Sequence, residues 1–300
     1  MIKTQEIHCN LCNISEAEVL FEGVDRLHGF EGEFRYVKCP KCGLIYMCPQ
    51  IIFEELGVYY PQDYQPHNAK GNTNSKKSAK LPFREDILKV ISADSKVLDV
   101  GCGNGEFLAL LRDRTNCKAY GLDLSENAVK TASEVHGLDV FQGTISDASY
   151  EHGFFDMITA WSYIEHVNDP YSVLQQMYAL LKPQGYLVLK TPNANSFNAR
   201  FFKEKWYHLD CPRHLFLFSP KNLTAMLNNA AFDVQGIDYE KKSKGLLGSL
   251  QYSFYNNNYE PATKNRLRRS KLAKAIVSPF AKLLWLMKQS DTMTIYAKKH

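Results

Sequence analysis

An apolar strand that runs into three alternating glycines constrains the fold of this chain more than any other feature. Residues 97–111 read Val-Leu-Asp-Val-Gly-Cys-Gly-Asn-Gly-Glu-Phe-Leu-Ala-Leu-Leu, with Gly101, Gly103 and Gly105 leading into a helical pattern. A side chain at the end of the strand would hold the backbone away from a ligand lying across it, so only glycine suits this place. The pattern predicts a strand, a loop and a helix that together contact a nucleoside.

A second strand ends in a carboxylate at the spacing typical of a strand-helix-strand unit. Residues 118–124 read Lys-Ala-Tyr-Gly-Leu-Asp-Leu, and Asp123 follows Gly105 by eighteen residues. In such a unit an acid at this place accepts hydrogen bonds from a ribose diol. Asp123 is therefore the predicted ribose-binding residue.

The loop differs from the fingerprint of dinucleotide-binding proteins. That fingerprint is Gly-x-Gly-x-x-Gly, and counting from Gly101 its last position is occupied here by Glu106. A pyrophosphate would lie poorly beside that carboxylate. A ligand with a positive centre and no phosphate tolerates acids at Asp99, Glu106 and Asp123, and S-adenosylmethionine, a sulfonium with an adenosine, fits that description.

The stretch from Val97 to Gly105 resembles the first motif of class I S-adenosylmethionine-dependent methyltransferases. The resemblance continues through residues 163–170, Tyr-Ile-Glu-His-Val-Asn-Asp-Pro, covers nearly the whole chain and is weakest over 243–290. It implies an α/β, Rossmann-like sheet of seven strands, mostly parallel, with the last strand antiparallel at the edge. Strands are expected at 97–100, 118–124, 139–142, 155–161, 185–191 and 291–297, and helices at 84–93, 105–114, 125–136 and 171–181.

The resemblance also implies which residues contact the cofactor. The adenine pocket is expected at Gly143, Thr144 and Ile145, with Asp147 as a nearby acid. Trp161 either packs against the ligand or caps the core. The full predicted set is Asp99, Gly101, Cys102, Gly103, Gly105, Asp123, Leu124, Thr144, Ile145 and Trp161.

Two Cys-x-x-Cys pairs precede this domain, namely Cys9 with Cys12 and Cys39 with Cys42. The doubled spacing is typical of a structural Zn²⁺ site, in which metal binding stabilises a segment too small to hold a core alone. Buried free thiols and an iron–sulfur cluster are the alternatives, and Cys48 is an alternative ligand. The surrounding residues resemble the zinc-ribbon-like N-terminal module of bacterial methyltransferases that modify sugars, nucleotide sugars and glycans.

Two of the nine histidines are candidates for a catalytic base. An aliphatic hydroxyl is a poor nucleophile, so a base near neutral pKa is expected beside it. His166 follows the fourth strand, and His214 lies in an insert after the fifth. We rank His214 first because its neighbours Asp210 and Arg213 are residue types that hydrogen-bond a sugar.

Length and composition permit one large domain with a small addition, because 300 residues with 45% hydrophobic content can bury a full core. We predict a zinc module over 1–62, a linker over 63–82 and a methyltransferase domain over 83–300. Acceptor-side inserts are expected at 192–218 and 241–290. The absence of a signal-like start and of a long apolar run leads us to expect a cytoplasmic protein with reduced thiols.

Residues 261–290 hold eight lysines or arginines and no acid. One interpretation is a solvated helical pair over the active site, interrupted at Pro279. The other is contact with an anionic partner: the inner membrane face, a lipid-linked glycan or a nucleotide diphosphate.

The predicted function is methylation of a sugar, nucleotide-sugar or glycan at oxygen. Carbon methylation of a keto-sugar nucleotide is the next hypothesis. An RNA methyltransferase that uses the zinc module for recognition is another, but the net charge of +4 and the lack of a basic, aromatic face in 1–62 argue against it. A scaffold that binds the cofactor without catalysis is the last.

Overall fold

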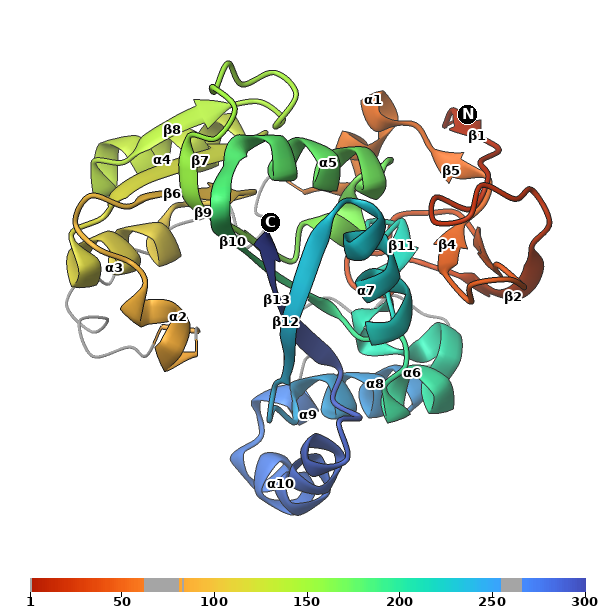
Figure 1. Cartoon of the computed structure of the whole chain (residues 1–300). Coiled ribbons are helices and arrows are strands. Elements are labelled where there is room, and N and C mark those ends of the chain that lie inside the picture. Colours follow the sequence, from red (N-terminus) through yellow and green to blue (C-terminus); the bar gives the residue numbers. More distant parts are fainter. Residues whose placement is uncertain (1, 62–80, 83, 255–265) are drawn as a thin grey trace.

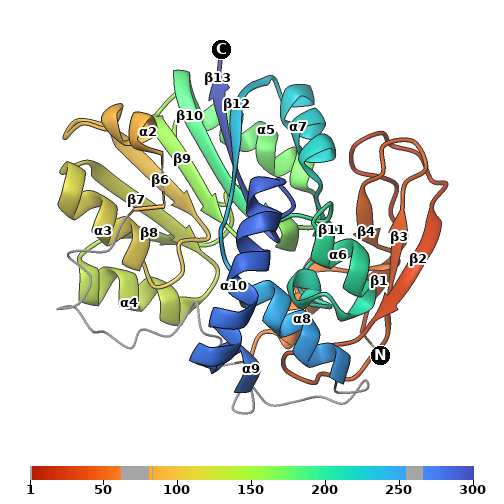
Figure 2. The ribbon, with the colours of Figure 1, turned by 90° about the horizontal axis from the view of Figure 1, so that it is seen from below.

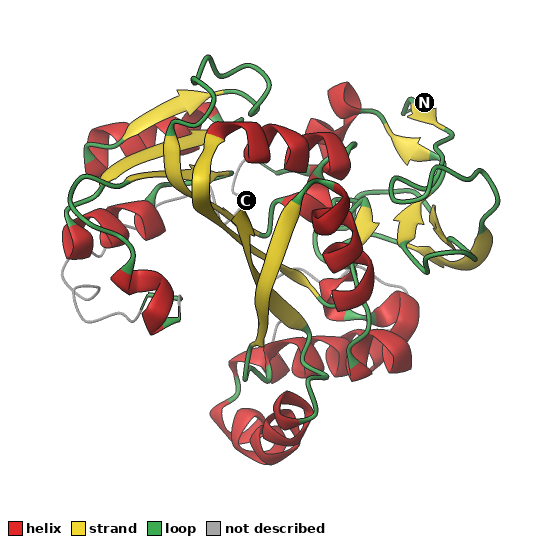
Figure 3. Ribbon diagram, viewed as in Figure 1, coloured by secondary structure: helices red, strands yellow, loops and turns green. Residues whose placement is uncertain are grey.

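The structure is a computed structural model, and it describes residues 2–61, 81–82, 84–254 and 266–300 (Figures 1 and 3). The predicted linker at 63–82 lies outside the described residues except for Leu81 and Pro82. The described elements form a central seven-stranded sheet with helices beside it. A four-stranded and a two-stranded sheet lie at the N-terminal end.

The central sheet has seven strands in the order β12-β13-β10-β9-β6-β7-β8. Its strands are β6 (Lys96–Val100), β7 (Lys118–Asp123), β8 (Asp139–Gln142), β9 (Phe155–Trp161), β10 (Leu181–Pro192), β12 (Phe232–Tyr239) and β13 (Thr292–Lys299). All neighbouring pairs are parallel except those of β13, which runs antiparallel to β10 and β12. The predicted α/β sheet of the class I methyltransferase fold is confirmed.

Two details of the sheet differ from the sequence prediction. The last strand does not lie at the edge, because β12 pairs with its far side and becomes the edge strand itself. The sequence analysis did not locate β12, in which the alternation of apolar and polar residues is broken by the irregular register between Val234 and Gly236.

Helices flank both faces of the sheet (Figure 2). They are α2 (Glu85–Lys89), α3 (Glu106–Thr115), α4 (Glu126–His136), α5 (Pro170–Leu180) and α7 (Pro220–Asn229). The Ser125 hydroxyl accepts a hydrogen bond from the Ala128 N–H and so caps α4 as predicted, and Asp169 caps α5 in the same way. Helix α2 is shorter than the predicted 84–93.

The N-terminal part forms a small sheet that the rest of the chain completes. The strands of this part are β1 (Thr4–Gln5), β2 (Glu18–Gly23), β3 (Phe34–Lys38), β4 (Ile45–Met47) and β5 (Gln50–Ile51), followed by α1 (Phe53–Leu56) and η1 (Gly57–Tyr59). Strands β1 and β5 pair only with each other, in a separate two-stranded sheet. Strand β11 (Phe216–Leu217) comes from the insert after β10 and pairs with β4, giving the order β11-β4-β3-β2. The buried rings of Tyr46 and Phe216 stack across this junction.

The two inserts build a helical layer beyond the carboxyl end of β10. The first contains α6 (Phe197–Phe202), η4 (Lys203–Lys205) and η5 (Tyr207–Leu209). The second contains α8 (Lys244–Phe254), α9 (Arg266–Arg269) and α10 (Lys271–Leu286). The predicted interruption at Pro279 is wrong: α10 continues through it, with Ala281 and Leu284 buried in the turns that follow.

Candidate active site

The glycine loop adopts backbone conformations that only glycine takes easily. Gly101, Gly103 and Gly105 have φ angles of 72°, 53° and 77°. A Cβ atom built on Gly101 would lie 2.6 Å from the Tyr163 ring, and one on Gly105 would lie 2.6 Å from Leu138. The close approaches that these two glycines allow are therefore to the protein's own side chains, and Tyr163 joins the loop as a residue the sequence reading gave no role.

Asp123 ends β7 and holds the glycine loop against the start of α4. One carboxylate oxygen accepts the Gly103 N–H at 2.8 Å and the other accepts the Ser125 N–H at 2.9 Å. A carboxylate oxygen can accept more than one hydrogen bond, so these contacts are compatible with a carboxylate that also accepts ribose hydroxyls. The ribose-binding role of Asp123 remains a prediction with suitable geometry.

Asp99 lies buried beneath the loop, where the Thr159 hydroxyl is 2.6 Å from its carboxyl. Burial is the main cause that raises the pKa of Asp99 to about 8, and the charge of Asp123 adds to it. Cys102 is buried too, and its sulfur would collide at 2.7 Å with a Cβ on Gly121. Both residues shape the loop from below, and their contact with a cofactor remains a prediction.

The other predicted cofactor residues follow the carboxyl ends of β7, β8 and β9, which meet at one edge of the sheet. Thr144 donates from its N–H and its hydroxyl to Asp147, at 2.8 and 2.6 Å, so Asp147 fixes this turn. Ile145 is buried and Leu124 is exposed. Trp161 contacts Phe107 edge-on, with ring centroids 4.9 Å apart.

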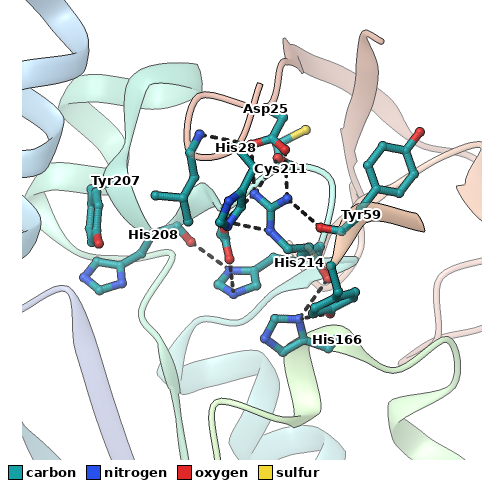
Figure 4. Close-up of polar contacts among 12 residues, drawn as sticks. Asp25, His28, Tyr59, His166, Tyr207, His208, Cys211 and His214 are labelled. Carbon is teal, nitrogen blue, oxygen red and sulfur yellow. Dashed lines mark hydrogen bonds and ion pairs between the residues drawn. The ribbon is translucent and has the colours of Figure 1, made fainter. Parts of the chain in front are cut away.

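The two predicted histidines, His166 and His214, lie close together (Figure 4) and form one cluster with Glu165. The ring centroids of His166 and His214 are 4.6 Å apart, and their side-chain nitrogens lie within 4.8 Å of a Glu165 oxygen. Glu165 and His166 belong to η3 (Ile164–His166), which follows β9, and the Glu165 carbonyl accepts the Leu215 N–H. Two loops that are distant in sequence thus converge beside Tyr163 and the glycine loop.

The hydrogen bonds of His214 define its tautomer. Its Nδ1 lies 2.9 Å from the His208 carbonyl oxygen, which can only accept, so Nδ1 carries the proton in the neutral ring. Its Nε2 then bears a lone pair, 3.7 Å from Asp210 and 4.0 Å from Glu165. Burial lowers the pKa of His214, which keeps this ring neutral and able to take up a proton.

His166 and Glu165 are held differently. The His166 Nδ1 lies 3.1 Å from the Arg213 carbonyl and 2.9 Å from the Tyr60 hydroxyl, and burial lowers its pKa to about 3. Burial raises the pKa of Glu165 to about 8, so its neutral form is favoured at neutral pH. The sequence reading quoted the Glu-His pair but assigned Glu165 no role.

Arg213 is completely buried in an ion network and cannot reach a sugar, which corrects our expectation for it. Its guanidinium donates two hydrogen bonds to Asp25, at 2.8 and 2.9 Å, and two to Asp210, at 2.8 and 3.1 Å. It also donates to the Tyr59 carbonyl at 3.1 Å. Asp25 and Tyr59 come from the N-terminal part, so this network ties that part to the residue next to His214 (Figure 4).

The four predicted cysteines converge on one point. Neighbouring sulfur atoms lie 3.4 to 3.5 Å apart, and none of the four forms a disulfide. The residue after each pair, Asn13 or Gly43, has a positive φ, and the tight turns it allows aim the thiols inward. The set fits a tetrahedral metal ion. Cys48 lies outside it, since its thiol donates to Glu6, and its role as an alternative ligand is wrong.

The sheet order, the glycine loop and the acid ending β7 define the class I methyltransferase fold. Residues 75–236 match the family model described as "Methyltransferase domain", and the chain belongs to this family. It is an S-adenosylmethionine-dependent methyltransferase.

The chain is similar to two ubiquinone biosynthesis O-methyltransferases among others. The one from Xanthomonas euvesicatoria pv. vesicatoria is 31% identical over 168 residues, which are 49% of this chain and 68% of that protein. The one from Xanthomonas oryzae pv. oryzae is 32% identical over 181 residues, 53% and 73% of the two chains. A solved SAM-dependent methyltransferase from Archaeoglobus fulgidus has a TM-score of 0.50 and 21% identity, covering 72% of this chain and 90% of that one, and it shares the fold.

Proposed function

We propose that this methyltransferase acts on a hydroxyl oxygen and that His214 is its base. When bound, S-adenosylmethionine supplies a sulfonium methyl group whose leaving thioether is neutral, so positioning accounts for most of the rate. The acceptor oxygen forms the new bond to the methyl carbon as the carbon–sulfur bond breaks. Its proton passes to the Nε2 lone pair of His214.

The hydrogen bond between His214 and the His208 carbonyl carries this proposal, because it leaves Nε2 free of a proton. The nearby carboxylate of Asp210 stabilises the imidazolium that forms. His166 contacts the ring of His214 edge-on and orients it. The O-methyltransferase names of the similar proteins support oxygen as the methylated atom.

A sugar, nucleotide-sugar or glycan acceptor remains our finer proposal, and it rests on the resemblance of the N-terminal module. A phenolic acceptor is the second candidate. Burial lowers the pKa of His214, and so weak a base suits a phenol, with a pKa near 10, better than an aliphatic alcohol. The relatives' place in ubiquinone biosynthesis, by name, also favours it.

Methyl-labelled cofactor separates these candidates. The protein is incubated with S-adenosylmethionine and separate pools of sugars, nucleotide sugars, phenols and RNA, and the label is traced to the acceptor. Label on a sugar or phenol oxygen supports the proposal and chooses between the two acceptors. Label on carbon or RNA, or cofactor binding without transfer to any pool, contradicts it.

We propose that the Cys9, Cys12, Cys39 and Cys42 cluster holds Zn²⁺ in a structural role. The four thiolates would hold the ion and leave no open position, so the metal would cross-link the N-terminal turns and take no part in methyl transfer. Through Asp25 and Arg213 the turns so held support the loop of His214.

A further inference from the structure

Helix α10 presents a continuous apolar stripe to solvent. The apolar residues of this stripe recur at intervals of three or four residues, so they lie along one side of the helix. They are Leu272, Ile276, Phe280 and Leu283, with Met287 directly after the last residue of α10. Leu272 is 71% exposed and Ile276 is 68% exposed. A helix that covers a protein core turns such a stripe inward, but here it faces out.

The inward side of α10 is a different set of residues. Ala281 and Leu284 are buried, and Val277 packs against the main hydrophobic core. The helix is therefore anchored to the protein without its outer stripe. Figure 1 shows α10 at the bottom of the molecule, below the ends of β12 and β13.

Helix α6 extends the stripe into a patch. The ring of Phe201, which is 66% exposed, stacks on Phe197 at 5.5 Å, and Phe197 meets Phe280 edge-on at 5.5 Å. We call the exposed set the apolar patch: Phe201, Leu272, Ile276, Phe280, Leu283 and Met287. An exposed apolar surface spread over two helices is typical of an interaction site.

The charged residues on the two helices of the patch are all positive. Lys271, Lys274, Lys282 and Lys288 are exposed along α10 and just after it, and Arg200 is exposed on α6. Neither helix contains an aspartate or glutamate. A partner that fits this face must accept apolar side chains and carry negative charge.

We propose that the apolar patch binds the surface of an anionic lipid bilayer. An amphipathic helix with apolar and basic sides lies in the headgroup region, where its apolar residues enter the acyl boundary and its lysines meet anionic headgroups. In the described part of the chain no helix is long and apolar enough to cross a membrane, so the contact is with one leaflet. A second copy docked on the same face would bring the lysines of both α10 helices together, which like charges disfavour.

Vesicle flotation with the full chain tests this proposal. The protein is mixed with phosphatidylcholine vesicles with and without phosphatidylglycerol, at low and high salt. Binding is expected with phosphatidylglycerol, and salt should weaken it because the lysines are exposed. The Lys274→Gln/Lys282→Gln variant is expected to bind roughly 30-fold more weakly, and Leu272→Ser/Ile276→Ser at least tenfold more weakly.

A matched control removes exposed valines elsewhere. Val19 and Val135 are 63% and 53% exposed on β2 and α4, and Val19→Ser/Val135→Ser should leave vesicle binding unchanged. Wild-type protein that stays with the soluble fraction at every lipid composition would overturn the proposal. So would a dimer, seen by sedimentation velocity, that Ile276→Ser dissociates, because the patch would then be a self-association surface. Cofactor binding by calorimetry is measured separately, so a failure of the proposed catalysis is distinguishable from a failure here.

Discussion

The guanidinium of Arg213 and the carboxylate of Asp25 form a two-pronged, fully buried ion pair, with nitrogen–oxygen distances of 2.8 and 2.9 Å, although the residues are 188 positions apart. Asp25 belongs to the cysteine-containing N-terminal part and Arg213 is the neighbour of the proposed base. The pair therefore links the two parts of the protein at the point where they share a site.

Replacing Asp25 with asparagine should weaken both stability and turnover. Loss of Asp25 leaves Asp210 as the remaining carboxylate beside the buried guanidinium, so we expect a cost of about 3 kcal/mol of unfolding free energy, the lower end for breaking a buried pair. Because the Arg213 carbonyl also contacts His166, kcat should fall at temperatures where the variant is still folded. Denaturant titration and initial rates measure the two effects. Asp113→Asn, which removes an exposed pair with Arg112, should change neither by much, and equal effects in both variants would contradict the coupling.

Replacing His214 with asparagine should lower turnover by about 10²- to 10⁴-fold, the usual contribution of a general base. The affinity for S-adenosylmethionine should not change, since the ring lies outside the predicted cofactor residues. Calorimetry gives the affinity and labelled methyl transfer gives the rate. His152→Asn, at an exposed position, is the control, and normal turnover in the His214 variant would exclude His214 from the mechanism.

Removing the proposed metal should destabilise the N-terminal part. Cys39→Ser and treatment with a strong chelator are both expected to lower the melting temperature and the Zn²⁺ content measured by mass spectrometry. Cys117→Ser changes a buried cysteine outside the cluster and should keep the metal. Purified wild-type protein that melts at the same temperature with and without chelator would contradict a structural metal.

Asp99 should make the cofactor-free protein less stable as pH rises. Its pKa is about 8 in the folded protein and about 3.9 when unfolded. The stability from burying its neutral form is complete below the unfolded pKa and is lost as pH rises through the folded one. Asp99→Asn should therefore match wild type at pH 4 and exceed it near pH 9, as measured by thermal melting. If the difference in melting temperature between the variant and wild type does not vary with pH, Asp99 is not the group whose titration lowers the stability.

The Gly101→Ala variant tests the contact between the loop and Tyr163. Alanine must accept a positive φ and also displace a ring 2.6 Å from its Cβ. Gly137→Ala is the matched control, because Gly137 has a similar φ of 61° with open space around it. Both variants should lose about 1 kcal/mol to backbone strain, and only Gly101→Ala should also bind S-adenosylmethionine more weakly in calorimetry. Equal affinity for S-adenosylmethionine in the two variants would contradict a role of this loop in binding the cofactor.

Features carried by short stretches of sequence were predictable. Each of these features is defined by residues that lie close together in the sequence: the glycine spacing, the acid that ends β7 and the paired cysteines. The structure places them as expected. Strand β12 was not predicted, because the irregular register between Val234 and Gly236 interrupts its alternation of apolar and polar residues. A strand of this kind becomes evident only in the structure, from its pairing with a neighbouring strand such as β13.

The role of Arg213 could not be read from its neighbours. Beside Asp210 and His214 it resembles a ligand-binding residue, and only the folded chain brings Asp25 against it and buries the charges of Arg213 and Asp25. The roles of Glu165 and Tyr163 depend in the same way on loops that meet in space. Local pattern identified the region of the site, and long-range packing decided which side chains remain available for chemistry.

The pairing of β4 with β11 affects the order in which this protein can be made. Phe216 pairs with Tyr46, 170 residues earlier, so the small sheet lacks its last strand until most of the chain has left the ribosome. A nascent chain that stops before residue 216 should expose the free edge of β4, and such an edge can pair with a strand of another chain. The nascent chain would then depend on chaperones that cover this edge during translation.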